Sequence, residues 1–417
     1  MATRPMTASD RLRSSATEAA GGASPAGGRS VADERCDPRA WACVDLAAIA
    51  SNAARLAEIA APAALMAVVK ADGYGHGLVA SARAALAGGA SWLAVAYGTE
   101  ALSLRAAGIG ARTLCLVPVP DEDLDALLRA DVDVTASSVP RLDEIARAAQ
   151  RAGAPARVHL EVDTGLGRGG CPPAEWPTLV TRAVAAQSSG ALWVTGIWSH
   201  LAFGEDAAHP VTTGQLAVFE SALATAERLG ARPEVRHLAN SGATLGLPAA
   251  RFDLVRCGIA LYGLSPGPAL RAPETFGLRP AMTLSARVSL VKAVPAGTGV
   301  SYGHRYLTAA PTQLAVVPLG YADGVPRAAT NRAEVLVRGG RASSRHWIAG
   351  TVCMDQFVVD LGAAAVVRTG DEVVLFGPGD DGEPTAQQWA DALDTIPYEI
   401  VTRVGRRVPR RFRPGPQ

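Results

Sequence analysis

The chain of 417 residues is long enough to form two domains, each with a full hydrophobic core. Its hydrophobic content is 48% and its charged content 19%, and 40 Lys and Arg against 39 Asp and Glu give a formal net charge of +1. This balance excludes an electrostatic basis for binding nucleic acid or an anionic membrane. No apolar run reaches the roughly 20 residues that a membrane-spanning helix needs.

The six cysteines are scattered and contain no C-x-x-C pair, and Cys115, Cys257 and Cys353 lie in apolar runs. This pattern indicates buried thiols in a reducing compartment, and we therefore expect a cytoplasmic protein. We predict no metal site. Residues 1–39 are rich in Ala, Gly, Ser and Arg and lack the apolar segment of a secretory signal, so we predict a disordered tail.

From residue 40 to residue 275, short apolar runs alternate with amphipathic stretches. A helix is expected to open at 45–49, and further helices are expected at 141–151 and 213–229. The predicted strands are 65–70, 92–96, 113–117, 132–136, 158–162, 192–197, 235–239 and 253–262. Repeated β-then-α units of this kind predict an α/β domain, a (β/α)8 TIM-like barrel. A doubly wound sheet is the alternative on the pattern alone.

Residues 276–417 have a different texture, in which Val-rich runs are separated by Gly and Pro turns. We predict a mostly antiparallel β domain here, with one helix at 385–393 for which Thr385 is the N-cap. The domain boundary is expected between residues 263 and 278. The predicted strands are 284–294, 314–318, 335–337, 357–361 and 372–375.

Lys70 ends the first apolar run of the predicted barrel and is followed at once by the glycine-rich segment 71–77. Partial loss of water disfavours the charged form of an amine, which makes it a nucleophile near neutral pH. A Lys at a strand end is more commonly solvated, and a Schiff-base aldolase would also fit Lys70 alone. The sequence therefore predicts a Schiff-base lysine whose chemistry depends on its neighbours.

Other polar residues follow the later predicted strands, and in a barrel such positions gather at one mouth. His200 on its own could be a hydrogen-bonded structural histidine, and Asn240 with Ser241 could cap the next helix. Arg256 within an apolar strand must be paired with something. Together with the glycine-rich loop 163–170 that carries Arg168, these residues suit an anionic aromatic cofactor.

The string from Ala67 to Gly77, A-V-V-K-A-D-G-Y-G-H-G, closely resembles the pyridoxal-phosphate lysine motif of the alanine racemases. The resemblance runs from about Trp41 to about Phe412. It implies a barrel that binds pyridoxal 5'-phosphate, a second β domain, and a head-to-tail homodimer with composite active sites. The implied reaction interconverts L-alanine and D-alanine, the latter for peptidoglycan.

The resemblance also implies roles for individual residues. Lys70 carries the cofactor, Arg256 faces its pyridine nitrogen, and Arg168 reaches its phenolic oxygen and the substrate carboxylate. The remaining residues implied to bind the cofactor are Tyr74, Asn240, Ser241, Gly258, Ile259 and Tyr398, of which Tyr398 also narrows the pocket.

The two faces of the substrate carbon need two acid–base groups, and Lys70 serves one of them. The segment V-S-Y-G resembles the family motif whose tyrosine, here Tyr302, comes from the partner subunit as the second base, supported by His200 and Arg256. G-Y-A-D-G is similar to the family string that supplies Tyr321 as a gate. V-C-M-D-Q supplies Met354 and Asp355 for the substrate.

Two positions depart from the family pattern. Glu161 stands where the family often has a carbamylated lysine, and we expect its carboxylate to hold Arg168. Thr351 stands where the family often has an arginine of the substrate corridor, which leaves the substrate range open. The alternatives are a serine or broad-specificity racemase, a barrel decarboxylase with the same cofactor, and a non-catalytic pyridoxal-phosphate carrier that resembles the barrel alone.

Overall fold

The computed structural model describes residues 39–340 and 342–414, so the predicted disordered tail, apart from Arg39, lies outside the described residues. In the described part of the chain, no helix combines the length and the apolar character needed to cross a membrane. The same residues contain no group of three or more His, Cys, Asp or Glu side chains arranged to hold a metal ion.

A parallel eight-stranded sheet forms the first domain, in the order β8-β7-β6-β5-β4-β3-β2-β9. Its ends meet through two backbone hydrogen bonds, from Asp253 N–H to the Arg236 carbonyl (3.1 Å) and from Arg256 N–H to the Ala239 carbonyl (3.0 Å). The predicted barrel is therefore confirmed. The strands are β2 (Ala64–Val68), β3 (Trp92–Val95), β4 (Arg112–Cys115), β5 (Asp133–Ala136), β6 (Ala156–Glu161), β7 (Leu192–Trp198), β8 (Val235–His237) and β9 (Leu254–Cys257).

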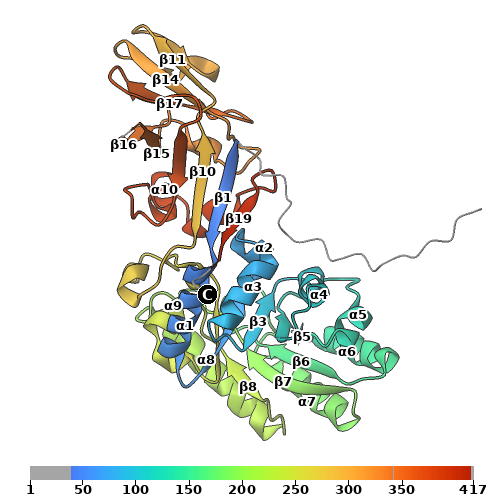
Figure 1. Ribbon diagram of the computed structural model, residues 1–417. Coiled ribbons are helices and arrows are strands. Elements are labelled where there is room, and N and C mark those ends of the chain that lie inside the picture. Colours follow the sequence, from blue (N-terminus) through green and yellow to red (C-terminus); the bar gives the residue numbers. More distant parts are fainter. Residues whose placement is uncertain (1–38, 341, 415–417) are drawn as a thin grey trace, which may run out of the picture. The chain divides into compact units, whose positions relative to one another are not determined.

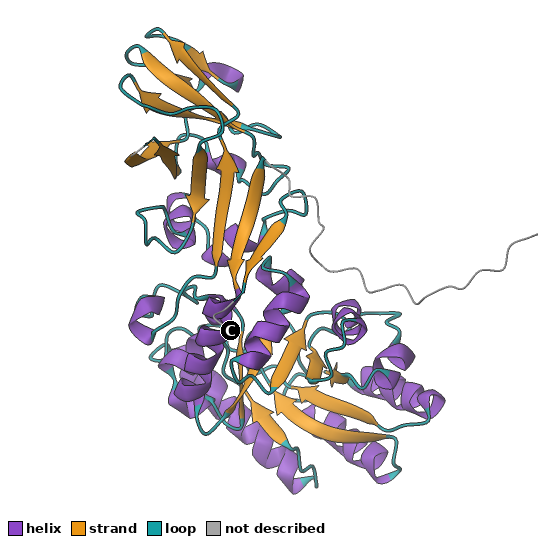
Figure 2. Ribbon diagram, viewed as in Figure 1, coloured by secondary structure: helices purple, strands orange, loops and turns teal. Residues whose placement is uncertain are grey.

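Helices follow the strands and pack outside them, as Figure 2 shows. Helix α6 (Val139–Ala152) illustrates why these segments are helical. Its N-cap Ser138 accepts a hydrogen bond from Arg141 N–H, and Gly153 ends the helix in the left-handed conformation. Leu142 and Ile145 lie on its buried face. The helices are α1 (Leu46–Ala60), α2 (Lys70–Tyr74), α3 (Leu78–Ala87), α4 (Gly98–Ala106), α5 (Leu124–Arg129), α6 (Val139–Ala152), α7 (Trp176–Ser188), α8 (Pro210–Arg228) and α9 (Ser241–Gly246).

The remaining strands form a six-stranded sheet in the order β16-β15-β18-β10-β1-β19, a three-stranded sheet β11-β14-β17, and the pair β12-β13. All pairs are antiparallel except β1 with β19, which confirms the mostly antiparallel β domain. The elements are β1 (Ala40–Asp45), β10 (Met282–Arg287), β11 (Leu290–Val294), β12 (Gly299–Val300), β13 (Tyr306–Leu307), β14 (Thr312–Val317), β15 (Glu334–Gly339), β16 (Ala342–Trp347), β17 (Phe357–Gly362), β18 (Glu372–Phe376), α10 (Ala386–Ala392), α11 (Pro397–Thr402) and β19 (Arg410–Arg413).

The structure differs from the sequence interpretation in three places. The predicted strand 253–262 ends at Cys257, and residues 259–262 form a 3-10 helix. The first strand of the range 40–275, β1, pairs with β10 and β19 and so belongs to the six-stranded sheet (Figure 1). The run 284–294, predicted as one strand, is two strands in different sheets, because the chain leaves the first sheet after β10 and enters the second at β11. The predicted cap is confirmed, since Thr385 forms a capping box with Gln388 at the start of α10.

Candidate active site

Lys70 lies two residues after the end of β2, at the start of a tight left-handed turn. Ala71, Asp72, Gly73 and Tyr74 all have positive φ angles, between 52° and 62°. Such a conformation costs about 1–2 kcal/mol for each residue that carries a Cβ atom, so the surrounding structure must hold it. The left-handed turn is a strained element at the predicted reactive lysine.

Two carboxylates hold the backbone of this turn. One Glu100 carboxylate oxygen accepts a hydrogen bond from Ala71 N–H (2.7 Å), and the other accepts one from Ala96 N–H (2.9 Å). The Asp72 carboxylate accepts one from Leu78 N–H (2.7 Å). These bonds tie the turn to the loop after β3 and to the start of α3, which fixes where the Lys70 side chain leaves the backbone.

The Lys70 amine faces a cavity of about 730 Å³ at the mouth of the barrel. Burial lowers the pKa of Lys70, and the nearby positive charge of Arg168 lowers it further. All the residues predicted on the barrel side of the site line this cavity: Lys70, Tyr74, Arg168, His200, Asn240, Ser241, Arg256, Gly258, Ile259 and Tyr398. The structure thus brings together residues from strand ends far apart in the sequence.

One side of the cavity gathers hydroxyl and backbone N–H groups. The Ser241 hydroxyl accepts hydrogen bonds from Gly258 N–H (2.9 Å) and Ala260 N–H (3.4 Å). A Cβ atom at Gly258 would lie 2.2 Å from the Tyr74 hydroxyl, so only glycine fits there. Burial raises the pKa of Tyr74, which therefore stays a protonated donor. Small hydroxyls and backbone N–H groups of this kind suit phosphate oxygens.

Asn240 also has the structural role considered from the sequence. Its side-chain oxygen accepts a hydrogen bond from Ala243 N–H (3.1 Å), which makes Asn240 the N-cap of α9. Tyr398 reaches the cavity from α11, and burial raises the pKa of its phenol too. The cavity is therefore closed in part by the segment that follows α10.

Arg256 is almost fully buried, at 3% exposure, and is heavily hydrogen-bonded. Its two terminal nitrogens donate to the carbonyls of His237 (2.9 Å), Ser199 (2.7 Å) and Leu238 (3.2 Å). Burial lowers the pKa of Arg256 to about 10, so the guanidinium remains charged at neutral pH. Among the described residues no protein acceptor takes its Nε–H, which leaves this donor for a ligand.

His200 is a neutral acceptor rather than a second cation. Its Nδ1 lies 3.3 Å from a terminal nitrogen of Arg256, which can only donate. Burial, and then the charges of Arg256, Arg168 and Lys70, hold the pKa of His200 well below its ordinary value. The proton of the imidazole is consequently on Nε2. Of the two side chains expected to support Tyr302, only Arg256 is therefore positively charged.

Glu161 lies at the end of β6 and lines the same cavity. No direct hydrogen bond or ion pair joins Glu161 to Arg168 in the described part of the chain, but the two side chains line the same cavity and the charge of Arg168 acts on Glu161, so that its role in holding Arg168 stays a prediction. Burial raises the pKa of Glu161 to about 7, partly offset by the charges of Arg256 and Arg168. The carboxylate is too well shielded from water to be a stable anion below neutral pH.

We expect the Glu161→Gln variant to be more stable than the wild type above pH 7 and equally stable below pH 4.5. A carboxyl whose folded-state pKa is raised from 4.5 to about 7 destabilises the fold progressively between these values, because the unfolded chain loses its proton first. The full effect is on the order of 3 kcal/mol. Thermal unfolding at pH 4.5 and pH 8 measures it, with the exposed Glu58→Gln as the control. Equal unfolding temperatures of variant and wild type at pH 8 would contradict the expectation.

Apart from Tyr398, the site residues predicted on the second domain do not line the barrel cavity of their own chain. Tyr302 is 75% exposed, Met354 is 53% exposed and Tyr321 is 43% exposed. Asp355 is exposed as well, and its carboxylate pairs with Arg407 (2.8 Å). These side chains therefore lie on the surface of the single chain.

A set of short contacts nevertheless brings these segments together. The Ser301 hydroxyl donates to the Thr351 carbonyl (2.6 Å), and the Thr351 hydroxyl donates to the Tyr302 carbonyl (2.8 Å). Tyr321 N–H donates to the Cys353 carbonyl (3.0 Å). Ser301 itself has φ 61° and ψ −171°, a conformation that only glycine adopts easily. Thr351 is buried, and its hydroxyl anchors the backbone of Tyr302.

A barrel whose mouth holds a lysine of lowered pKa among hydroxyl and N–H groups, followed by a β domain that exposes Tyr302 and Tyr321, indicates a two-domain enzyme. Comparison with known proteins agrees. A family model described as "Alanine racemase, N-terminal domain" matches residues 44–266, and one described as "Alanine racemase, C-terminal domain" matches residues 281–412. The chain belongs to the alanine racemase family.

Individual relatives are similar along nearly the whole chain. An alanine racemase of Frankia casuarinae is 57% identical over 376 residues, which are 90% of this chain and 97% of the relative. One of Thermobifida fusca is 58% identical over 373 residues, covering 89% and 98%. The crystal structure of the alanine racemase from the D-cycloserine-producing Streptomyces lavendulae superposes with a TM-score of 0.88 at 52% identity and covers 90% of this chain and 97% of that one.

Proposed function

We propose that the chain interconverts L-alanine and D-alanine with pyridoxal 5'-phosphate, and so supplies D-alanine for peptidoglycan. The observation that carries this proposal is the Lys70 amine of lowered pKa in a cavity that also holds Arg256 and the Ser241–Gly258 cradle. Family membership supports the reaction. The free, buried thiols of Cys115, Cys171 and Cys257 support the expected cytoplasmic location.

The cavity fits pyridoxal phosphate by the chemistry of its donors. Tyr74, Ser241, Gly258, Ile259 and Tyr398 would hold the phosphate, because protonated phenols, a hydroxyl and backbone N–H groups are donors to phosphate oxygens. Lys70 would bind the carbonyl carbon covalently. When bound, the cofactor withdraws electrons from the amino acid and so acidifies its Cα–H bond.

Arg256 would place its unused Nε–H toward the pyridine nitrogen. Because its pKa stays at about 10, the guanidinium donates a hydrogen bond without giving up its proton at neutral pH. Asn240 supports the cradle by capping the helix that begins at Ser241. Arg168, which also lines the cavity, is a cation suited to the carboxylate of the amino acid.

Racemisation requires a proton to leave one face of Cα and another to arrive at the opposite face. The lowered pKa of Lys70 suits its amine to one of these transfers. Tyr302 is our candidate for the other face, and its 75% exposure in its own chain fits a head-to-tail homodimer in which it enters the partner's cavity. Tyr321, Met354 and Asp355 would enter with it, near the substrate.

Chiral chromatography of the purified protein tests the reaction directly. We expect pyridoxal phosphate-dependent formation of D-alanine from L-alanine, and far slower conversion of L-serine because Tyr398 narrows the cavity. Conversion of L-serine at a comparable rate would favour a broad-specificity racemase. Failure to convert any amino acid by a protein that binds the cofactor would contradict the proposed function.

We also expect two inactive variants to restore activity when their subunits are exchanged. A mixed dimer of Lys70→Ala and Tyr302→Phe subunits would contain one site with both native residues and one with neither. Random exchange then returns about a quarter of the wild-type rate. Lys70→Ala mixed with the double variant is the control and should stay inactive. If Lys70 and Tyr302 of one subunit act in the same active site, subunit exchange should not restore activity.

A further inference from the structure

Three polar side chains lie inside the barrel sheet and have no part in the proposed function. They are Asp133 on β5, His159 on β6 and His237 on β8, each at 0% exposure. Strands of a parallel barrel are covered on both faces and are normally apolar. Buried polar groups of this kind destabilise the fold unless they are hydrogen-bonded.

The three side chains form one continuous series of hydrogen bonds. His159 Nε2 lies 3.1 Å from Asp133 Oδ2, and His159 Nδ1 lies 2.9 Å from His237 Nε2. His237 Nδ1 lies 3.2 Å from a terminal nitrogen of Arg256. We call this series, from Asp133 through His159 and His237 to Arg256, the barrel relay. It ends at the arginine that our proposed function turns toward the cofactor.

A glycine makes the middle of the barrel relay possible. β7 lies between β6 and β8 in the sheet, and its Gly196 pairs with His159 in register. A Cβ atom at Gly196 would lie 2.2 Å from His159 Nδ1. Any other residue at position 196 would therefore fill the space through which the two imidazoles meet.

The direction of every hydrogen bond in the barrel relay follows from its two ends. The Arg256 guanidinium carries only N–H donors. His237 Nδ1 must therefore be the unprotonated nitrogen that accepts, and His237 Nε2 carries the proton. His237 Nε2–H therefore donates to His159 Nδ1. At the other end, a carboxylate can only accept, so His159 donates from Nε2. Both ends independently assign the proton to Nε2 of both histidines.

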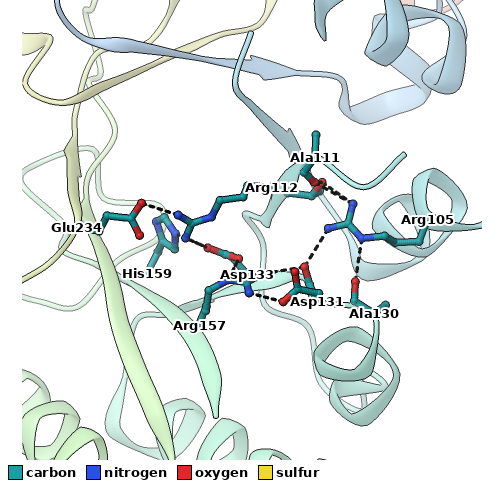
Figure 3. Close-up of polar contacts among 10 residues, drawn as sticks. Arg105, Ala111, Arg112, Ala130, Asp131, Asp133, Arg157, His159 and Glu234 are labelled. Carbon is teal, nitrogen blue, oxygen red and sulfur yellow. Dashed lines mark hydrogen bonds and ion pairs between the residues drawn. The ribbon is translucent and has the colours of Figure 1, made fainter. Parts of the chain in front are cut away.

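Asp133 is held as a carboxylate by its other neighbours. Its oxygens accept hydrogen bonds from Arg157 Nε (2.5 Å) and from a terminal nitrogen of Arg112 (3.1 Å), as Figure 3 shows. Although burial raises the pKa of Asp133, the His159 hydrogen bond and the two arginine charges hold it below its ordinary value. The barrel relay thus begins at a fixed negative charge.

We propose that Asp133, His159 and His237 are positioning residues for Arg256, because they keep a bare nitrogen of His237 directed at its guanidinium. The proposal rests on the proposed function, in which Arg256 faces the cofactor. If every hydrogen bond of the barrel relay exchanged its donor and acceptor, His237 Nδ1 would carry a proton that points at an Arg256 N–H. The guanidinium would then have to move. Its other bonds go to three backbone carbonyls and to His200 Nδ1, and none of these acceptors replaces the lost bond to His237.

Nitrogen-15 NMR of the wild-type holoenzyme, labelled only at its seven histidines, tests which nitrogen of each imidazole in the barrel relay carries the proton. The imidazole signals of His159 and His237, assigned by a Gln variant of each, should show a protonated Nε2 and a bare Nδ1. A proton on Nδ1 of either histidine overturns the proposal. If the tautomers are as expected but the protein does not racemise alanine, the proposed function fails while the relay stands.

The Asp133→Asn variant tests the effect on Arg256. An amide at residue 133 has one oxygen for the N–H donors of His159, Arg112 and Arg157, so its NH2 group must face His159 or Arg157. Facing His159 it reverses the tautomers of both histidines, and in either orientation the relay loses its negative charge, so the absorption maximum of bound pyridoxal phosphate should shift. We expect kcat to fall about 10-fold, the effect of one displaced hydrogen bond, with the KM for alanine unchanged. The control is Asp253→Asn, which removes the charge of another carboxylate bound to an arginine of the barrel. Wild-type tautomers and spectrum in Asp133→Asn would overturn the proposal.

Discussion

Replacement of Lys70 by Ala is expected to abolish racemisation, with a fall in kcat of more than about 10⁴-fold, because both a covalent attachment and an acid–base group are lost. The visible absorption band of the cofactor bound to the lysine should disappear as well. Chiral chromatography and the absorption spectrum of the dialysed protein measure the two effects. The left-handed turn is anchored by backbone bonds to Glu100 and Asp72, so we expect the variant to fold.

The sequence offers a matched control for this experiment. Lys70 and Lys292 are the only lysines in the chain, and Lys292 is exposed on β11. Lys292→Ala should keep both the band and the activity. Borohydride reduction of the holoenzyme, followed by peptide mass analysis, should place the label on Lys70 alone. A label on Lys292 would remove the basis of the proposed function.

Replacement of Tyr302 by Phe is expected to lower the rate of racemisation by about 10²–10⁴-fold, the share of one general acid–base group. Because Lys70 remains, one alanine enantiomer should continue to exchange its Cα proton with deuterium from the solvent without forming the other. Mass spectrometry combined with chiral chromatography separates exchange from inversion. The phenyl ring keeps the shape of the side chain, so the loss of racemisation rate can be assigned to the missing hydroxyl.

A second tyrosine of the same domain controls for the loss of a phenol. Tyr306 donates its hydroxyl to the Asp360 carboxylate (2.7 Å) and lies only four residues further along the chain. Tyr306→Phe should lose stability but retain inversion and exchange in their wild-type ratio. If Tyr302→Phe inverts alanine as fast as it exchanges the proton, the second base is another group.

The barrel side of the candidate site can be predicted from the sequence because its residues follow predicted strands. Strand ends share one mouth in a barrel, so the order of the strands is enough to place Lys70, His200 and Arg256 together. Whether Glu161 bonds directly to Arg168 is not predictable in this way, since it depends on where a loop directs the Arg168 side chain. The neutral state of His200 likewise follows only from its three-dimensional neighbours.

The barrel relay is not among the sequence predictions, although the sequence holds a signal for it. Asp133, His159 and His237 lie within predicted strands of the barrel, and buried polar residues must find partners. The sequence does not reveal that His159 and His237 can meet across the intervening strand β7, because β7 has a glycine, Gly196, at that position. The split of residues 284–294 between two sheets is hidden for a related reason, because apolar character continues through Val288 while the pairing partner changes.

The placement of β1 cannot be inferred locally, since its partners β10 and β19 lie more than 200 residues away along the chain. It also has a consequence for how the protein is made. During synthesis on the ribosome, β1 emerges first but cannot pair until residues 282–287 and 410–413 have followed it. The nascent barrel therefore carries an unpaired strand until β10 follows it, more than 200 residues later, and a fragment that ends with the barrel would leave β1 without its partners.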